Sequence, residues 1–219
     1  MSLGQETALT DQAFRSNKLK GRHFEATYAG ALSFLRRRYS RDLTGVDIAV
    51  TGIPYDSAVT YRPGCRLGPR AIRAASVQLA ELPAFPWNFD PFETLAVVDY
   101  GDAELNPHDP LSIPGDIQAH AAEILKTDTK MLSFGGDHFV TYPLLKAHAE
   151  KHGPLALLQF DAHCDTWTSL GAIDHGSMFR TAVDEGVIDT SRSIQVGLRT
   201  SNDDGDYGFK QLTAPWVHR

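Results

Sequence analysis

Short apolar runs alternate with helix-like segments from about Val46 onward, and this alternation constrains the fold more than any other feature of the chain. Five runs are predicted as strands, at residues 47–51, 95–98, 130–134, 155–160 and 193–198. Three helices are predicted between them, at residues 69–82, 111–125 and 142–152. Alternation of this kind favours right-handed crossovers between parallel strands, with helices on both faces of the sheet. We therefore predict the α/β fold class, as a three-layer α/β/α arrangement around a mainly parallel sheet.

The predicted domain begins after an N-terminal arm. Residues 1–45 are polar and basic, include Arg36, Arg37 and Arg38, and show no clear period. A nucleic-acid-binding arm is one interpretation, but a solvated arm that packs over the domain is favoured. We accordingly predict an arm at residues 1–45 and a single domain at residues 46–219. No internal repeat and no low-complexity tract is found.

Composition and charge limit the classes of function. With 219 residues, of which 42% are hydrophobic and 22% charged, the chain can bury one substantial core. A net charge of −6 argues mildly against nucleic acid as a partner and is compatible with a cationic substrate. The sequence starts without the pattern of a signal peptide and holds no apolar run of membrane-spanning length. We expect a cytoplasmic protein with neither a nucleic acid nor a membrane as partner, and a disulfide between Cys65 and Cys164 stays open.

A ligand-rich segment follows the fourth predicted strand. The apolar run 155–160 leads directly into Asp161, His163 and Asp165. In an extended chain alternate side chains project to one side, so these three would share a face. Two carboxylates and an imidazole suit a hard or borderline divalent cation such as manganese. The plainer alternative is a polar strand end that starts a loop.

Two further polar clusters strengthen the prediction of a metal site. The predicted strand 130–134 ends in Gly135, Gly136, Asp137 and His138. Because the carboxyl ends of parallel strands share one edge of a sheet, His138 can converge with the Asp161 cluster. The segment 174–176 adds His175, which could move protons near neutral pH or could simply cap the next helix at the surface.

Other motifs give less. His148 and His152 lie four residues apart on one predicted helix face, but the charged residues around them indicate a solvated face. The sequence contains no HExxH zinc motif, no GxSxG elbow, no P-loop and no GxGxxG fingerprint. Serine hydrolase, nucleotidase and dehydrogenase functions therefore lose their usual support.

Taken together, the three polar clusters resemble those of the ureohydrolase family of arginases and agmatinases, in the same order and at similar spacing. The resemblance extends upstream through residues 52–56 and 62–73, and covers nearly everything from about residue 28 to residue 200. Residues 85–89, 133–141 and the passage from Asp165 through Trp167 into 174–179 place it closest to the agmatinases.

The resemblance implies an arginase-like fold and a set of site residues. His138, Asp161 and Asp165 would bind one Mn²⁺ ion, Asp161 and His163 would bind a second, and Asp161 would bridge the two. His175 would match the family's proton-shuttling histidine. No substrate-binding residue is assigned.

The implied activity is manganese-dependent hydrolysis of a guanidino compound by a metal-bridging hydroxide. Agmatine is the first choice of substrate, with putrescine and urea as products, which would place the enzyme in putrescine biosynthesis and polyamine metabolism. The resemblance also implies a homo-oligomer, a hexamer or a trimer. The alternatives are a guanidinobutyrase or guanidinopropionase, and a non-catalytic ureohydrolase-like binding protein. A metallophosphoesterase would need a Gly-Asn-His segment, which the sequence lacks.

The chain departs from the family pattern at its end. The family's Ser-Phe-Asp-Ile-Asp motif, followed by Asp-Pro, is absent before Arg219. One metal would then lack one protein carboxylate and the other would lack two. We expect the sequence to be a C-terminally incomplete fragment whose activity is uncertain. In the family's sheet the last two strands lie between the strand ending at His138 and the strand ending at Asp165. Those two strands are therefore expected at unpaired edges.

Overall fold

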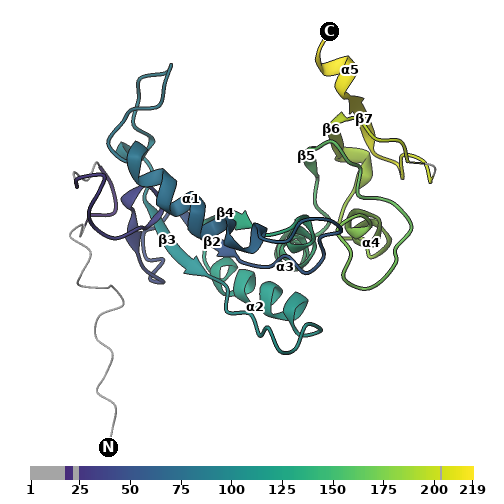
Figure 1. The fold of residues 1–219 in the computed structure, drawn as a ribbon, viewed down its shortest axis with the longest axis horizontal. Helices are drawn as coiled ribbons and strands as arrows, with labels where there is room; N and C mark the ends of the chain where they lie inside the picture. The colour runs from purple at the N-terminus through teal and green to yellow at the C-terminus, as the bar shows by residue number, and fades with distance from the viewer. Residues whose placement is uncertain (1–17, 22–24, 203) are drawn as a thin grey trace, which may run out of the picture. The chain divides into compact units, whose positions relative to one another are not determined.

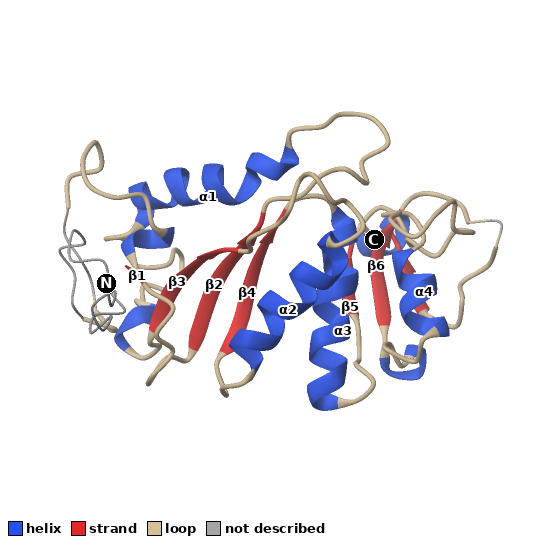
Figure 2. Ribbon diagram, turned by 90° about the horizontal axis from the view of Figure 1, so that it is seen from below, coloured by secondary structure: helices blue, strands red, loops and turns tan. Residues whose placement is uncertain are grey.

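The computed structural model describes residues 18–21, 25–202 and 204–219, and divides the chain into two compact units. Unit 1 comprises residues 1–54, 64–104 and 123–136, and unit 2 comprises residues 55–63, 105–122 and 137–219. Figure 1 traces the chain from the purple N-terminal segments to the yellow C-terminal ones. Every strand pairing within the two units is parallel, and helices accompany the strands (Figure 2). The prediction of a parallel α/β fold is confirmed.

Unit 1 is built on a four-stranded sheet with the order β1-β3-β2-β4. Its strands are β1 (Arg38–Tyr39), β2 (Ile48–Ile53), β3 (Val97–Asp102) and β4 (Lys130–Gly135). Helix α1 (Gly68–Ser76) runs over this sheet and contacts β2 and β4 (Figure 2). Pro69 stands in its first turn, where the missing N–H has no helical partner to lose. The predicted helix start is therefore reproduced.

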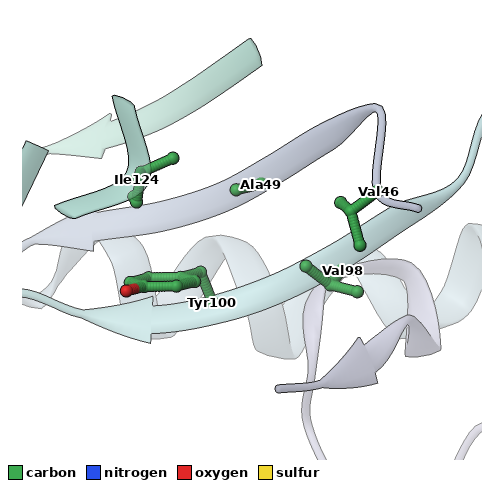
Figure 3. Packing of buried hydrophobic residues seen from close by; sticks show 5 residues of the cluster. All are labelled: Val46, Ala49, Val98, Tyr100 and Ile124. Atoms are coloured by element: carbon green, nitrogen blue, oxygen red, sulfur yellow. The ribbon is translucent and has the colours of Figure 1, made fainter. Parts of the chain in front are cut away.

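The core of unit 1 joins its sheet to the last residues of helix α2 (Ile113–Leu125), of which residues 123–125 belong to this unit. Ile124 from its last turn packs with Ala49 and Val98, and the cluster is completed by Val46 and Tyr100 (Figure 3). Ala49, Val98 and Ile124 are fully buried. Strand β2 is buried along nearly its whole length, as expected for the middle strand of a parallel sheet. Continuous apolar character at residues 47–51 therefore predicted this strand correctly.

The basic cluster of the arm is not solvated. Arg36 and Arg37 are 4% and 1% exposed. The guanidinium of Arg36 donates to Glu25, and that of Arg37 lies 4.1 Å from the ring centre of Phe92. The expectation of a solvated arm was wrong for these two residues, because local carboxylate, carbonyl and aromatic groups accept the buried guanidinium groups. The parts of the arm at residues 1–17 and 22–24 lie outside the described residues, and the boundary near residue 45 stays a prediction.

Unit 2 is built on a three-stranded sheet with the order β5-β6-β7. Its strands are β5 (Leu158–Phe160), β6 (Ile194–Leu198) and β7 (Lys210–Thr213). Unit 2 also contains the helices α3 (Thr141–His152), α4 (Met178–Asp184) and α5 (Ala214–Val217). Helix α3 packs against α4. Short 3-10 helices occur across the two units at Phe34–Arg36, Cys65–Leu67, Val77–Leu79, Pro91–Glu93, His138–Val140 and Thr190–Arg192. No helix in the described part of the chain combines the length and the apolarity needed to cross a membrane.

The strands form two sheets, and the strands that end before His138 and Asp161 belong to different ones. Within their own sheets β4 and β5 each pair on one side only, so the expected unpaired edges are observed. Strand β5 is also shorter than the predicted run 155–160, because Leu155 forms an isolated bridge with Ile188 and does not pair with β6. Large apolar side chains stand exposed on these edges, namely Leu132 (43%), Leu158 (61%) and Phe160 (75%).

Candidate metal centre

Three side chains of metal-ligand type converge within unit 2. His138, Asp161 and Asp165 each offer one ligand atom, and these atoms lie within 4.8 Å of one another. The Nδ1 atom of His138 lies 2.7 Å from Oδ2 of Asp165 and 3.4 Å from Oδ2 of Asp161. The grouping joins the segment after β4 to the segment after β5, so the predicted convergence is observed, although β4 and β5 belong to different sheets.

Local structure fixes the position of His138. It opens a 3-10 helix whose N-cap is Asp137, and the Asp137 carboxylate accepts hydrogen bonds from Phe139 N at 2.9 Å and Ala58 N at 2.9 Å. Burial raises the pKa of Asp137, although these two backbone donors act in the opposite direction. The His138 ring also stands edge-on to buried Phe179, with ring centres 5.4 Å apart. The imidazole therefore keeps its Nδ1 edge turned toward the carboxylates.

Asp165 is the most buried of the three ligand side chains, with 7% of it exposed. Its backbone has φ of 52°, in the left-handed region that aspartate tolerates better than most residues. Its carbonyl accepts from Phe179 N at 3.1 Å, at the start of α4. A left-handed non-glycine backbone held by surrounding contacts is typical of functional sites.

His163 lies beside the cluster of three. Its Nδ1 is 3.5 Å from Oδ1 of Asp161, and 53% of its side chain is exposed. Strand β5 ends at Phe160, so a loop and not strand alternation brings Asp161 and Asp165 together. The structure therefore places His163 next to Asp161, the residue with which it was predicted to share a second ion, and the roles of these ligands remain predictions.

His175 is held on a loop that faces the same cavity. The Asp174 carboxylate accepts from Gly176 N at 2.9 Å and from Ser177 Oγ at 2.8 Å. Burial alone would raise the pKa of Asp174, but these hydrogen bonds, one from Leu170 N and the charge of His175 outweigh it and lower that pKa. The loop is closed by a hydrogen bond of 3.1 Å from Trp167 N to the Gly176 carbonyl.

The cavity itself has a volume of about 560 Å³. Its lining includes the five predicted site residues His138, Asp161, His163, Asp165 and His175. Sequence reasoning missed several other lining residues, among them Thr60 and Leu170. Neither has a local sequence signal, because each reaches the cavity from a loop whose path depends on the tertiary fold. The capping role of Asp137 did have a signal, since aspartate is a favoured N-cap residue.

The donor set fits a divalent cation. Two carboxylates lie close to one imidazole nitrogen, and a neutral imidazole can give the hydrogen on that nitrogen to only one of them. Two neighbouring carboxylates also repel each other unless a cation balances them. Oxygen and imidazole ligands suit manganese, zinc or iron better than they suit a thiolate-preferring metal.

The strands of both sheets are parallel, and carboxylate and imidazole side chains follow two of these strands. The protein is therefore of the α/β class, with a candidate site for a metal ion. The family model described as "Arginase family" matches residues 46–218. The chain belongs to the arginase family, and the predicted resemblance is confirmed.

The relatives place the chain near the agmatinases. It is 61% identical to an agmatinase of Chromobacterium violaceum, over 99% of this chain and 68% of that protein. It is 56% identical to the solved structure of a hypothetical agmatinase from Burkholderia thailandensis, with a TM-score of 0.90 over 97% of this chain and 68% of that one. The proclavaminate amidino hydrolase of Streptomyces clavuligerus matches at 35% identity with a TM-score of 0.79, over 89% of this chain and 67% of that one.

The chain therefore spans about two thirds of the length of these three relatives, 68%, 68% and 67%. Fold and sequence together make the chain a ureohydrolase-type hydrolase by class.

Proposed function

We propose that this protein is a manganese-dependent hydrolase of agmatine, which it converts to putrescine and urea. One observation carries the proposal. In a chain 61% identical to an agmatinase, His138, Asp161 and Asp165 converge on one point of a cavity that His175 also lines.

His138, Asp161 and Asp165 would hold one manganese ion, and Asp161 with His163 would contribute to a second. Bound divalent cations lower the pKa of water and so supply a nucleophile strong enough for the weakly electrophilic guanidinium carbon. The chain's own residues perform the remaining tasks. Asp174, which is not a predicted ligand, adds negative charge to the cavity that would receive the cationic guanidinium group, and the cavity limits the orientation of that group.

His175 would protonate the departing amine. A leaving amine must gain a proton as the carbon–nitrogen bond breaks, and an imidazole can supply it near neutral pH. The hydrogen bonds that Asp174 accepts from Gly176 N and Ser177 Oγ hold the loop that presents His175. Positioning of the donor and not its acidity alone would then determine how efficiently the proton is transferred.

The charge of the cavity favours agmatine over guanidinobutyrate or guanidinopropionate. Asp174 lines it and is not one of the predicted metal ligands, whereas none of the described lining residues is lysine or arginine. Agmatine carries a cationic amine at its far end, while the other two compounds carry a carboxylate. The charge of Asp174, which no metal ion would neutralise, would repel the carboxylate end of these alternatives.

Several wider features belong to the same proposal. A small guanidino molecule would be the substrate, the enzyme would act in polyamine metabolism in the cytoplasm, and it would assemble as a homo-oligomer, a trimer or a hexamer. The cytoplasmic location is supported by Cys65 and Cys164, neither of which forms a disulfide. Sedimentation velocity of the purified protein would test the assembly.

The activity is tested by urea release. The purified protein is loaded with Mn²⁺ and offered agmatine, guanidinobutyrate, guanidinopropionate and arginine. Urea and putrescine are expected from agmatine, and Asp165→Asn is expected to lower the rate at least about 100-fold, because loss of a ligand charge weakens metal binding. Asn tolerates the left-handed backbone of Asp165, so this variant separates charge from strain.

Two results would contradict the proposal. Faster urea release from a carboxylate-bearing compound would favour a guanidinobutyrase or guanidinopropionase. Tight Mn²⁺ binding without urea from any of the four compounds would favour a non-catalytic binding protein.

A further inference from the structure

Three buried or partly buried glutamines form a continuous ladder across the sheet of unit 2. Gln159 on β5, Gln195 on β6 and Gln211 on β7 lie directly opposite one another in the strand register. Gln159 and Gln195 are 5% and 0% exposed. Polar side chains so deeply buried need hydrogen-bond partners, since an unpaired buried amide is destabilising.

Every donor of the two buried amides is used. Gln211 Nε2 donates to Gln195 Oε1 at 3.0 Å, and Gln195 Nε2 donates to Gln159 Oε1 at 2.7 Å. The second hydrogen of Gln195 Nε2 goes to the Cys164 carbonyl at 2.7 Å. Gln159 Nε2 donates to the His163 carbonyl at 3.1 Å and lies 3.5 Å from Oδ2 of Asp165.

The direction of the ladder follows from its end points. The backbone carbonyls of His163 and Cys164 can only accept hydrogen bonds, so Gln159 and Gln195 must each turn their NH₂ group toward the loop. Each amide oxygen then faces the next glutamine along the ladder. Aligned amides polarise one another, and the donors that are not used within the ladder go to residues 163–165, the segment that carries the metal-ligand carboxylates.

The loop that receives these donors needs outside support. Residues 163, 164 and 165 are each contacted by a ladder amide, and Asp165 has its left-handed backbone there. Without these contacts the backbone would relax toward more populated conformations, and the Asp165 carboxylate would move away from His138. Ligand geometry in this loop therefore depends on side chains that never reach the cavity.

We propose that Gln159 and Gln195 are positioning residues for the metal centre, whose amides hold the loop Asp161–Asp165 so that its carboxylates converge on His138. This inference rests on the proposed metal-dependent function only in requiring that the loop bind a cation. The two glutamines contact the backbone of His163 and Cys164 and the carboxylate of Asp165. The inference predicts that the end of the ladder at Gln159 is important for metal binding and that the end at Gln211 is not.

The two ends of the ladder provide a matched pair of variants. Gln159→Met and Gln211→Met each remove the amide at one end of the ladder and replace it with a side chain of similar size. Each variant leaves Gln195 without one hydrogen-bond partner. Of these two glutamines, Gln159 alone has a hydrogen bond to the metal-ligand loop among those described. Mn²⁺ affinity is measured by electron paramagnetic resonance on the metal-free full chain, and the free energy of unfolding without metal is measured by urea denaturation.

We expect Gln159→Met to weaken Mn²⁺ binding by about 10- to 100-fold and to broaden the bound-Mn²⁺ spectrum, whereas Gln211→Met should change the affinity less than about threefold. Gln159→Met should also lower the metal-free stability more than Gln211→Met does, because Gln159 takes part in three hydrogen bonds and Gln211 in one, so the affinities are compared under conditions in which each variant is folded. Gln159→Glu, which keeps the shape and the acceptor toward Gln195 but presents oxygen to the His163 carbonyl, should weaken binding at least as much and serves if Gln159→Met does not fold.

Equal Mn²⁺ affinities for Gln159→Met, Gln211→Met and the unmodified chain would overturn the inference, as would equal losses at both ends of the ladder. The result is separable from the proposed function. If the unmodified chain does not bind Mn²⁺, the proposed function fails with it; if that chain binds Mn²⁺ and only the ladder variants fail to differ, the positioning role alone is overturned.

Discussion

Two carboxylates of the cavity are held by different kinds of contact. Asp165 is fixed by a left-handed backbone and by an imidazole 2.7 Å away, whereas Asp174 is fixed mainly by hydrogen bonds to its oxygens. A carboxylate whose hydrogen bonds are made in the ionised form loses them when it is protonated. Asp174 therefore links the loop of His175 to pH.

The substitution Asp174→Asn tests this link. The pKa of Asp174 is lowered in the folded chain, so its contribution to stability is fully present above the pKa of the unfolded chain, about 4. That contribution is lost as the pH falls through the lower folded pKa. We expect the variant to be less stable by about 1 kcal/mol at pH 6, and the difference to shrink below about pH 4.

Urea denaturation of both proteins between pH 3 and pH 7 measures this difference, and effects of other titrating groups cancel in it. Ser177→Ala removes one of the donors to Asp174 and should show a smaller change of the same sign. A stability difference that stays constant or grows toward low pH would contradict the argument.

At the scale of elements, the sequence located most helices and strands because turn residues mark their limits. Gly68 and Pro69 mark the start of α1, and Gly153 follows the last residue of α3. Strand β7 was not predicted, because Lys210–Thr213 has neither an apolar run nor clear alternation. Its pairing with β6 gives this segment its extended form, and that pairing is a tertiary contact.

The candidate site divides in the same way. His138, Asp161 and Asp165 could be predicted as candidate ligands because polar side chains directly after an apolar strand can be read from the sequence. Gln159 and Gln195 could not be predicted, since their role depends on the register between β5 and β6 and on the path of the following loop. A local sequence pattern does not encode the register between β5 and β6, because the 33 residues 161–193 lie between these two strands.

Helix α1 is attached to β3 by an ion pair that allows an element-scale prediction. Arg73 Nε and Nη2 donate to Asp99 at 2.8 and 3.0 Å, and Nη1 donates to Asp102 at 2.6 Å. The Asp99 side chain is 0% exposed. Arg73→Met should lower the free energy of unfolding by about 3–5 kcal/mol, because it leaves a buried carboxylate without its partner.

Arg70→Met provides the control for this experiment. Arg70 is on the same helix but is exposed, so its replacement should change the free energy of unfolding by no more than about 0.5 kcal/mol. Urea denaturation measures both variants. Similar losses for Arg70→Met and Arg73→Met would show that the ion pair with Asp99 does not anchor the helix.

At the scale of the whole chain, the described strands form two separate sheets, and the unpaired edges that the sequence predicts at β4 and β5 are edges of those sheets. Alternation specifies that strands are parallel and that helices cover them, but it does not specify which strands are neighbours. Strands β4 and β5 are consecutive in sequence and belong to different sheets, each at an edge. The apolar sequences of both strands predict buried side chains, but several of these side chains are exposed.

Because strand β5 has an unpaired edge, we expect this 219-residue chain to associate with itself. Leu158 is 61% exposed on a strand that pairs on one side only. An unpaired apolar edge offers backbone hydrogen-bonding groups and apolar surface to another chain, and a lysine on such an edge opposes pairing. We expect Leu158→Lys to lower the fraction of dimers and larger species in sedimentation velocity, at concentrations where the unmodified chain associates.

Leu82→Lys is the matched control, because Leu82 has nearly the same exposure, 62%, and lies in a turn outside the sheets. Both variants add one positive charge to a chain of net charge −6, so any general effect of charge on association is the same. If Leu82→Lys reduced association as much as Leu158→Lys, charge and not the β5 edge would explain the change. A decrease confined to Leu158→Lys would instead identify β5 as the contact, because only there does the added charge oppose strand pairing.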